Sequence, residues 1–346
     1  MDKVELEKQR KEAIRFLRQY GHDTINFNGR VVLAAPAHSA KNLMRVYMNG
    51  GNIGKIALND NVVTTGINAK KYSNKYSGEK PAVVDVLHKD SGMREAVRLE
   101  ALTNKEYLQY AEAATTVYSV KTDNVKDKER MVETIIMDFN NQKCGNAAID
   151  MEMQYSVRDH FGWTRDKKAG HIYLSEMEYR KKTWYNEYSF PINSDTKSPR
   201  IDLMVLNEEG VGFVELKVNN ESCENLGGHI RHMNYILSHK EGFKRDVERR
   251  VGVLEKYDLL EPEMEGNLKA WHETKNIWCG ILFVGNSSNL DGAKDLVRQN
   301  IDAFQDGIKC AFVDIEIIKR GKLNLSKEIF VLPSTFLDDS YKGTFE

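Results

Sequence analysis

The segment PRIDLMVLNEEGVGFVELK, residues 199–217, decides the fold. RIDLMVLN and VGFVELKV both alternate in a period of two and are separated only by a short turn containing Glu-Glu-Gly, so we predict two neighbouring strands in a tight hairpin. In such a hairpin Asp202 and Glu215 meet across the pair. Glu215 and Lys217 share one face because they stand two residues apart on a strand. The sequence therefore predicts two carboxylates and an ammonium held together among apolar neighbours.

This combination of charges suggests a particular chemistry. Burying charged groups without partners costs several kcal/mol each, and a divalent cation would offset that cost. Mg²⁺ prefers carboxylate oxygens, backbone carbonyls and water. The Lys217 ammonium can hold a water near deprotonation or neutralise charge that develops on a phosphoryl group, while the cation polarises the phosphate. The pattern predicts phosphodiester hydrolysis that depends on Mg²⁺, with Mn²⁺ as a substitute.

The order Pro199, Asp202, Glu215-Leu216-Lys217 resembles the PD-(D/E)XK signature of restriction-type and repair nucleases. The proline stands three residues before the aspartate rather than one, a departure that is common in the family. The resemblance covers roughly residues 127–318. It implies an α/β restriction-endonuclease-like fold, in which a mixed central sheet is flanked by helices and the core runs helix, three strands, helix, strand.

The same resemblance implies roles for individual residues. Asp202 and Glu215 would bind the metal, the carbonyl of Leu216 would add a third ligand, and Lys217 would be the catalytic lysine. Family members often carry a further glutamate on the helix before the first core strand. Glu133, in KERMVETIIMDF, is the best match for this catalytic position. Its rivals are Glu152, Glu178 and Glu187.

Other residues are candidates for contact with nucleic acid, for which DNA is favoured over RNA. The helix expected after the lysine strand, GGHIRHMNYIL, could present His229, His232 or Tyr235 to the site. Basic stretches interleaved with aromatic residues could contact a phosphate backbone. These stretches contribute Arg180, Lys181, Lys182, Lys244, Arg245, Arg249 and Arg250. Acidic residues are mixed among them, so solvated surfaces are the alternative reading.

Periodicity divides the chain at the polar run that ends the first third. Residues 1–122 are expected to form an α+β region that selects a target or binds a partner, and residues 123–346 the nuclease-like domain. Helices are expected at 4–20 and 104–117, from 127 onward, and at 229–237, 243–257 and 292–304. The expected strands are 29–36, 43–49, 54–58, 61–67, 82–87, 149–157, 171–179, 183–192, 200–207, 211–218, 276–285 and 309–318.

Composition and local motifs restrict the alternatives. The formal net charge is -1, so nucleic-acid binding must rest on local patches. The four cysteines stand far apart, without a CxxC pair, which argues against a zinc ribbon and a disulfide framework. A zinc site on His229, His232 and His239 is disfavoured because no cysteine or acid accompanies them. The segment NGGNIGK lacks the Ser or Thr of a phosphate loop, so a hairpin turn is the better interpretation.

The start of the chain is charged and no long apolar run follows, which predicts a cytoplasmic protein without a membrane partner. A homo-oligomer is expected by analogy, because members of the family often cut two strands as dimers. The competing hypothesis is a non-catalytic nucleic-acid-binding or scaffold protein that retains the nuclease fold. Cleavage of RNA is a third reading. Defence against foreign DNA and repair fit the residues equally well.

Overall fold

The computed structural model describes most of the C-terminal two thirds of the chain and, before it, mainly strand backbones. The described residues are Val4, Lys8, Lys11, 31–34, 43–48, 51–57, 64–66, 96–98, 125–137, 139–154, 200–219 and 226–345. The strands expected at 82–87, 171–179 and 183–192, and the helix at 104–117, lie outside these residues. Of the helix expected at 4–20, only the three named positions are described, and all three are helical.

A mixed five-stranded sheet forms the centre of the C-terminal part. Its strands are β6 (Ala147–Gln154), β7 (Arg200–Asn207), β8 (Gly210–Val218), β9 (Ile277–Gly285) and β10 (Ile308–Asp314), in the order β10-β9-β8-β7-β6. The three strands β6, β7 and β8 pair antiparallel, whereas β8, β9 and β10 pair parallel. The mixed α/β architecture expected from the sequence is therefore present.

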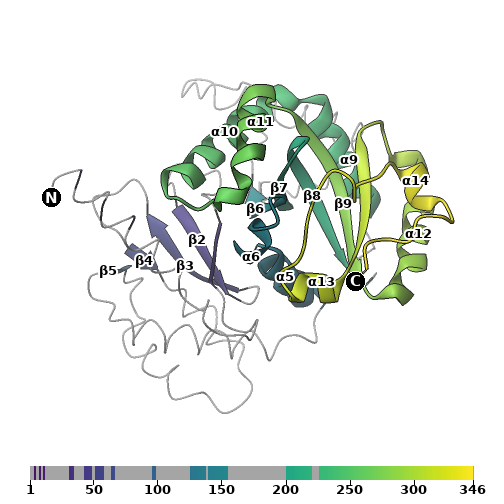
Figure 1. Ribbon diagram of the computed structural model, residues 1–346, viewed down its shortest axis with the longest axis horizontal. Helices are drawn as coiled ribbons and strands as arrows, with labels where there is room; N and C mark the ends of the chain where they lie inside the picture. Colours follow the sequence, from purple (N-terminus) through teal and green to yellow (C-terminus); the bar gives the residue numbers. More distant parts are fainter. Residues whose placement is uncertain are drawn as a thin grey trace, which may run out of the picture.

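Helices cover both faces of this sheet (Figure 1). On one face, α5 (Val125–Ile136) and α13 (Ile315–Lys319) pack on alternate residues of β7 to β10 such as Leu203 and Leu216. The other face is covered by α9 (Leu226–Ser238), α10 (Lys240–Lys256), α11 (Glu265–Thr274), α12 (Leu290–Gln299) and α14 (Pro333–Leu337). Successive residues of a buried strand point to opposite faces of the sheet, so the strands contribute to two hydrophobic cores, one on each face. None of the described helices has the length and hydropathy needed to cross a membrane.

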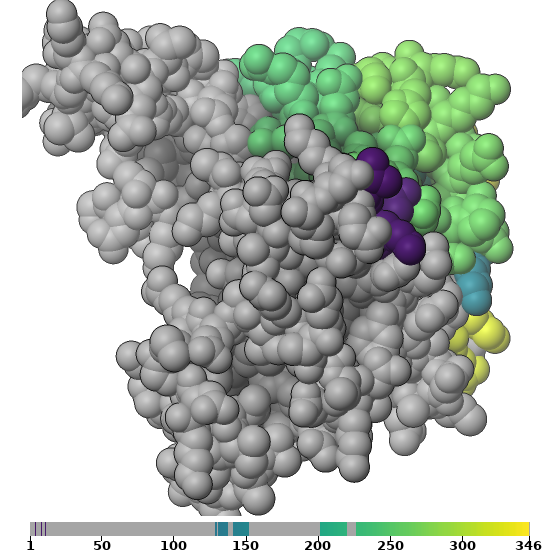
Figure 2. Space-filling model, turned by 90° about the vertical axis from the view of Figure 1, so that its left-hand side faces the viewer, coloured from purple at the N-terminus to yellow at the C-terminus, as the bar shows by residue number. Residues whose placement is uncertain are grey.

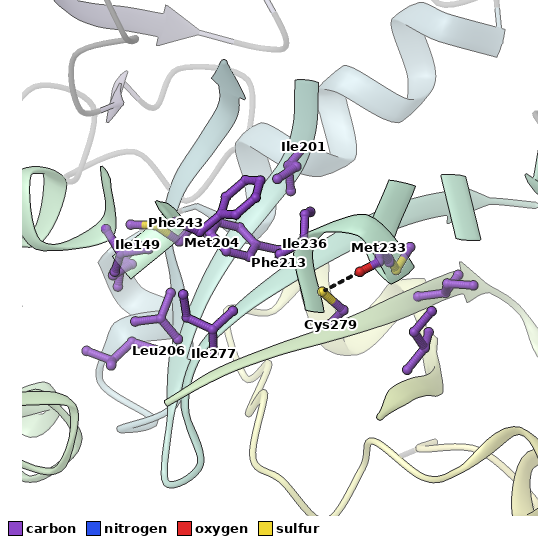
Figure 3. Packing of buried hydrophobic residues seen from close by; sticks show 14 of the residues in the cluster. Ile149, Ile201, Met204, Leu206, Phe213, Met233, Ile236, Phe243, Ile277 and Cys279 are labelled. Atoms are coloured by element: carbon purple, nitrogen blue, oxygen red, sulfur yellow. Dashed lines mark hydrogen bonds between the residues drawn. The ribbon is translucent and has the colours of Figure 1, made fainter. Parts of the chain in front are cut away.

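The larger core is shown in Figure 3. Phe213 of β8 meets Phe243 of α10 edge to face, with ring centroids 5.6 Å apart, an arrangement that adds about 1 kcal/mol to the burial of the rings themselves. The thiol of Cys279 lies 3.8 Å from the carbonyl oxygen of Met233 on α9. The first contact joins α10 to the sheet, and the second joins α9 to it.

A second described sheet lies in the N-terminal third. Its strands run in the order β1 (Val31–Ala34), β2 (Leu43–Met48), β3 (Gly51–Ala57), β4 (Thr64–Gly66) and β5 (Ala96–Arg98), all antiparallel. β2 and β3 pair antiparallel with Met48 opposite Gly51, in agreement with the hairpin expected at the NGGNIGK segment. Lys11 lies 4.0 Å from Asp258, and Figure 2 shows the described N-terminal residues, in purple, beside residues drawn in green.

The expectation of a strand through residue 318 was wrong. β10 ends at Asp314, and residues 315–319 form helix α13. The Asp314 side chain accepts a hydrogen bond from the backbone N–H of Glu316 and caps the helix. The run of isoleucines looked like a strand, but Ile317 and Ile318 are buried from a helix instead. Helices α11 and α14 were also missed, since their apolar spacing is weak.

Not every polar position of β6 is exposed to solvent. Asp150, one of its polar positions, is fully buried and bonded to the guanidinium of Arg250, which is buried as well. Arg250 was a candidate for contact with a phosphate backbone or for a solvated surface, and both interpretations were wrong because α10 directs it into the core. Removing either partner of such a buried ion pair is expected to destabilise the fold.

Gly210 closes the hairpin in a way that only glycine permits. Its φ is +116°, and an added Cβ would overlap the carbonyl oxygen of Asn276. We expect Gly210→Ala to lower the free energy of unfolding by about 3 kcal/mol, combining backbone strain with steric overlap. Denaturant unfolding measures this. Gly252→Ala is the matched control, because a Cβ there meets nothing within 4 Å, and a helical alanine adds about 0.5–1 kcal/mol. Equal effects at both glycines would contradict the argument.

Candidate active site

The β7–β8 hairpin brings Asp202 and Glu215 together. The ladder runs from Asn207↔Gly210 to Leu203↔Val214, so the next residues along, Asp202 and Glu215, stand opposite each other. Residues opposite each other in an antiparallel pair share a face. At this end of the hairpin the Asp202 side chain takes part in the pairing: its Oδ2 accepts a hydrogen bond from the backbone N–H of Leu216 at 2.9 Å. The backbone of Leu216, which lies between Glu215 and Lys217, thus fixes Asp202 at the open end of the hairpin.

Lys217 is the hub of the site. Its ammonium lies 2.6 Å from Glu215 Oε1 and 2.9 Å from the carbonyl oxygen of Leu216. The Lys217 side chain is only 3% exposed and that of Glu215 only 6%. A charge this deeply buried requires partners. Lys217 therefore contacts Glu215 and the Leu216 carbonyl directly, and Asp202 joins them through the Leu216 N–H.

A second glutamate reaches the site from helix α5, and it is Glu129. Its Oε1 lies 3.4 Å from the Lys217 ammonium. Glu133 lies one helical turn later and is almost fully buried. A spacing of four residues puts both on one side of the helix, so the sequence signal that favoured Glu133 applies to Glu129 equally. Sequence reasoning missed Glu129 because the amphipathic stripe marks the helix as a whole and does not choose between two glutamates one turn apart.

Helix α9 contributes His229, whose Nδ1 lies 2.8 Å from Glu215 Oε1. Its side chain is 34% exposed. The two other polar candidates from this helix are buried: His232 lies one turn later, and Tyr235 stacks on His239 with centroids 4.1 Å apart. Tyr235 belongs to the larger core. His229 thus contacts the hairpin charges directly.

The pKa values of Glu215 and Lys217 are set by two opposing effects, burial and ion pairing. Burial by itself raises the pKa of the Glu215 carboxyl, but Lys217 and His229 outweigh it and hold the pKa below its ordinary value. Burial lowers the pKa of the Lys217 ammonium, yet the carboxylates of Glu215, Asp202 and Glu129 raise it overall. Both groups are therefore ionised at neutral pH, and the pair is an ion pair in the low-dielectric interior.

Asp202 behaves in the opposite way. Burial and the neighbouring charge of Glu215 raise its pKa well above the ordinary value, although Lys217 and the Leu216 N–H oppose them. The pKa of His232 falls to about 3, mainly by burial and then by proximity to His229. His232 is consequently neutral at physiological pH. An acid with a raised pKa beside one with a lowered pKa is an arrangement typical of functional sites.

The donor set suits a hard cation. The carboxylates of Asp202, Glu215 and Glu129 and the carbonyl of Leu216 all offer oxygen, the ligand type that Mg²⁺ prefers. Three of these oxygen groups, all except Asp202, already surround a positive charge, the Lys217 ammonium. Within the described ranges, no three His, Cys, Asp or Glu side chains converge on a point that would hold a metal ion. The site fits a cation by donor chemistry, with the ammonium at the convergence of the oxygens.

Other sequence candidates are distributed as follows. Arg180, Lys181 and Lys182, like Glu178 and Glu187, lie outside the described residues, and only the backbone of Glu152 is described. On α10, Lys244 and Arg249 pair with acids three residues away, at 2.6 and 3.2 Å. These pairs match the solvated-surface alternative. The structure thus collects the hairpin residues and His229, but not the α10 cations, into one cluster.

Comparison with known proteins gives no relative. No protein-family model, no curated protein and no solved structure matches this chain.

Proposed function

We propose that this chain is a metal-dependent nuclease of the restriction-endonuclease-like class that hydrolyses phosphodiester bonds of nucleic acid, with DNA favoured over RNA. The observation that carries the proposal is the cluster of Asp202, Glu215 and Lys217 at the open end of the β7–β8 hairpin. The cofactor would be Mg²⁺, with Mn²⁺ as a substitute.

The order of the elements supports this class. Among the described elements, helix α5 and the short helix α6 (Phe139–Gln142) precede three antiparallel strands, helices α9, α10 and α11 follow, and β9 then pairs parallel to β8. Among these described elements, the order supports the core of helix, three strands, helix, strand that the PD-(D/E)XK signature implies. The acids lie on neighbouring strands and the lysine lies two residues after the second acid. Sequence pattern and topology therefore point to the same class of site.

The residues have separate tasks in this proposal. Asp202, Glu215 and the Leu216 carbonyl would hold the cation, with Glu129 as a further acidic group. When bound, Mg²⁺ supplies Lewis-acid polarisation of the phosphate and makes water a better nucleophile. Lys217 would move from its carboxylate partners to the reacting phosphate, where its ammonium neutralises charge as the bond to the leaving oxygen breaks. The buried surroundings strengthen this interaction because the local dielectric is low.

Cleavage of supercoiled plasmid, single-stranded DNA and RNA with Mg²⁺ or Mn²⁺ tests the proposal. We expect the wild-type chain to cut at least one of them, and Glu215→Gln to reduce the rate by at least about 100-fold, the usual loss when a group that stabilises the transition state is removed. Gel analysis with metal and with EDTA measures both.

Glu316→Gln is the matched control, because Glu316 is an exposed acid that pairs with Lys319 on α13, away from the hairpin. It should cut like wild type. A wild-type chain that cuts no DNA or RNA with either metal would exclude the nuclease. If it nevertheless binds nucleic acid, the non-catalytic binding function takes its place.

A further inference from the structure

Lys217 and His229 both donate to the same carboxylate oxygen of Glu215. Lys217 Nζ lies 2.6 Å from Oε1 and His229 Nδ1 lies 2.8 Å from Oε1. Neither contact uses Oε2. Because a carboxylate only accepts, the Nδ1 of His229 must carry the hydrogen in this contact. The carboxylate is therefore held from two elements, β8 and α9, by one of its two oxygens.

The His229 side of this arrangement is rigid. His229 lies in the first turn of α9, and its neighbour Ile230 and the later Met233 are buried in the larger core. The helix cannot rotate without exposing them. Part of the imidazole remains at the surface, so the histidine is not itself a core residue. The His229 ring is held by a packed helix and points at a buried carboxylate. This is the geometry of a residue that does not bind the metal itself but orients a residue that does.

We propose that His229 is a positioning residue for Glu215: by holding Oε1 together with Lys217, it turns Oε2 toward the divalent cation. This rests on the proposed function, since it assigns Glu215 as a cation ligand. Lys217 has another task during cleavage and must leave Oε1 to reach the phosphate. His229 then becomes the group that keeps the carboxylate from turning. Its contribution is to cation affinity first and to the rate only through the bound cation.

Calorimetric titration of the full chain with Mn²⁺ tests the assignment without cleavage as a readout. We expect His229→Ala to weaken Mn²⁺ binding by about tenfold or more, the range typical of lost outer partners of metal ligands. His229→Asn should stay within about threefold of wild type, because its amide N–H stands two bonds from Cβ, as Nδ1 does. His229→Gln, whose N–H is one bond further out, should behave like alanine. At saturating Mn²⁺ the alanine variant should recover most of its cleavage rate.

His272→Ala is the control, because His272 also contacts a glutamate, Glu255 at 3.0 Å, but on an exposed surface. It should leave Mn²⁺ affinity unchanged. Equal affinity in wild type and His229→Ala, with Asp202→Asn still reducing it, would overturn the role of His229 and leave the nuclease proposal standing. Equal losses in the asparagine and alanine variants would also overturn it. A wild-type chain without Mn²⁺ affinity would reject both proposals together.

Discussion

Lys217→Met should abolish cleavage and, at the same time, tighten the binding of Mn²⁺. The ammonium contacts oxygens of Glu215, Leu216 and Glu129, and a cation would bind at the same three groups. Two positive charges about 4 Å apart repel by about 1 kcal/mol in water and about 4 kcal/mol near a protein surface. Removing the ammonium should therefore raise Mn²⁺ affinity by roughly tenfold, a change of 1.4 kcal/mol. Cleavage should fall by roughly 1000-fold or more.

Lys217→Arg distinguishes the effect of the positive charge on Mn²⁺ binding from the role of the ammonium in cleavage. Arginine keeps the positive charge but replaces a compact ammonium with a planar group, so we expect cleavage to fall without a gain in Mn²⁺ affinity. Titration calorimetry and plasmid cleavage on both variants give the two readouts. Because Lys217→Met leaves Glu215 with one polar partner fewer, circular dichroism should verify that it folds. A methionine variant that binds Mn²⁺ no better than wild type would show that the ammonium does not compete with the cation.

Asp202→Asn should stabilise the metal-free protein while removing its activity. The raised pKa of Asp202 means that the folded chain binds a proton more tightly than the unfolded chain. Between the ordinary pKa of 3.8 and the raised folded-state pKa, the free energy of unfolding therefore falls as pH rises. Asparagine mimics the protonated acid and can still accept the Leu216 N–H. At neutral pH we expect a gain of about 1 kcal/mol, as is common when an active-site charge is removed.

Thermal unfolding between pH 4 and pH 8 measures this effect. The difference between Asp202→Asn and wild type should grow with pH in the metal-free protein and shrink when Mg²⁺ is added, because the cation stabilises only the chain that binds it. Asp338→Asn gives the opposite sign: hydrogen bonds from Ser340 lower the pKa of Asp338, so its removal should lower stability above that pKa. If Asp202→Asn unfolds at a lower temperature than wild type at pH 8 without metal, the raised pKa is not a source of instability.

Much of the hairpin could be predicted from local pattern alone. Strand β7 begins and ends where the alternation of RIDLMVLN indicates, and Gly210 closes the turn that Glu208 and Glu209 form. Strand spacing then places Glu215 and Lys217 on one face. Each of these properties depends on residues within a few positions of one another. Local periodicity and turn chemistry were therefore enough to find the acids and the lysine.

Local pattern failed where a side chain's surroundings come from distant segments. The isoleucines after Asp314 form a helix because the aspartate caps it and the smaller core accepts them. Arg250 reads as a surface cation, but α10 directs it at Asp150, 100 residues earlier in the chain. Apolar periodicity shows which face of an element is buried, but it does not show which distant group will meet a polar side chain there.

The sequence by itself determined the hairpin and the three charged residues that it carries, since spacing on paired strands leaves little choice of face. Only the tertiary structure decided which further groups join them. Glu129 and Glu133 lie on the same side of α5, and only the packing of that helix on β8 brings Glu129 to Lys217. His229 reaches Glu215 for the same reason, because the core fixes the rotation of α9. Contacts between distant elements depend on how those elements pack, and no spacing within either element records that.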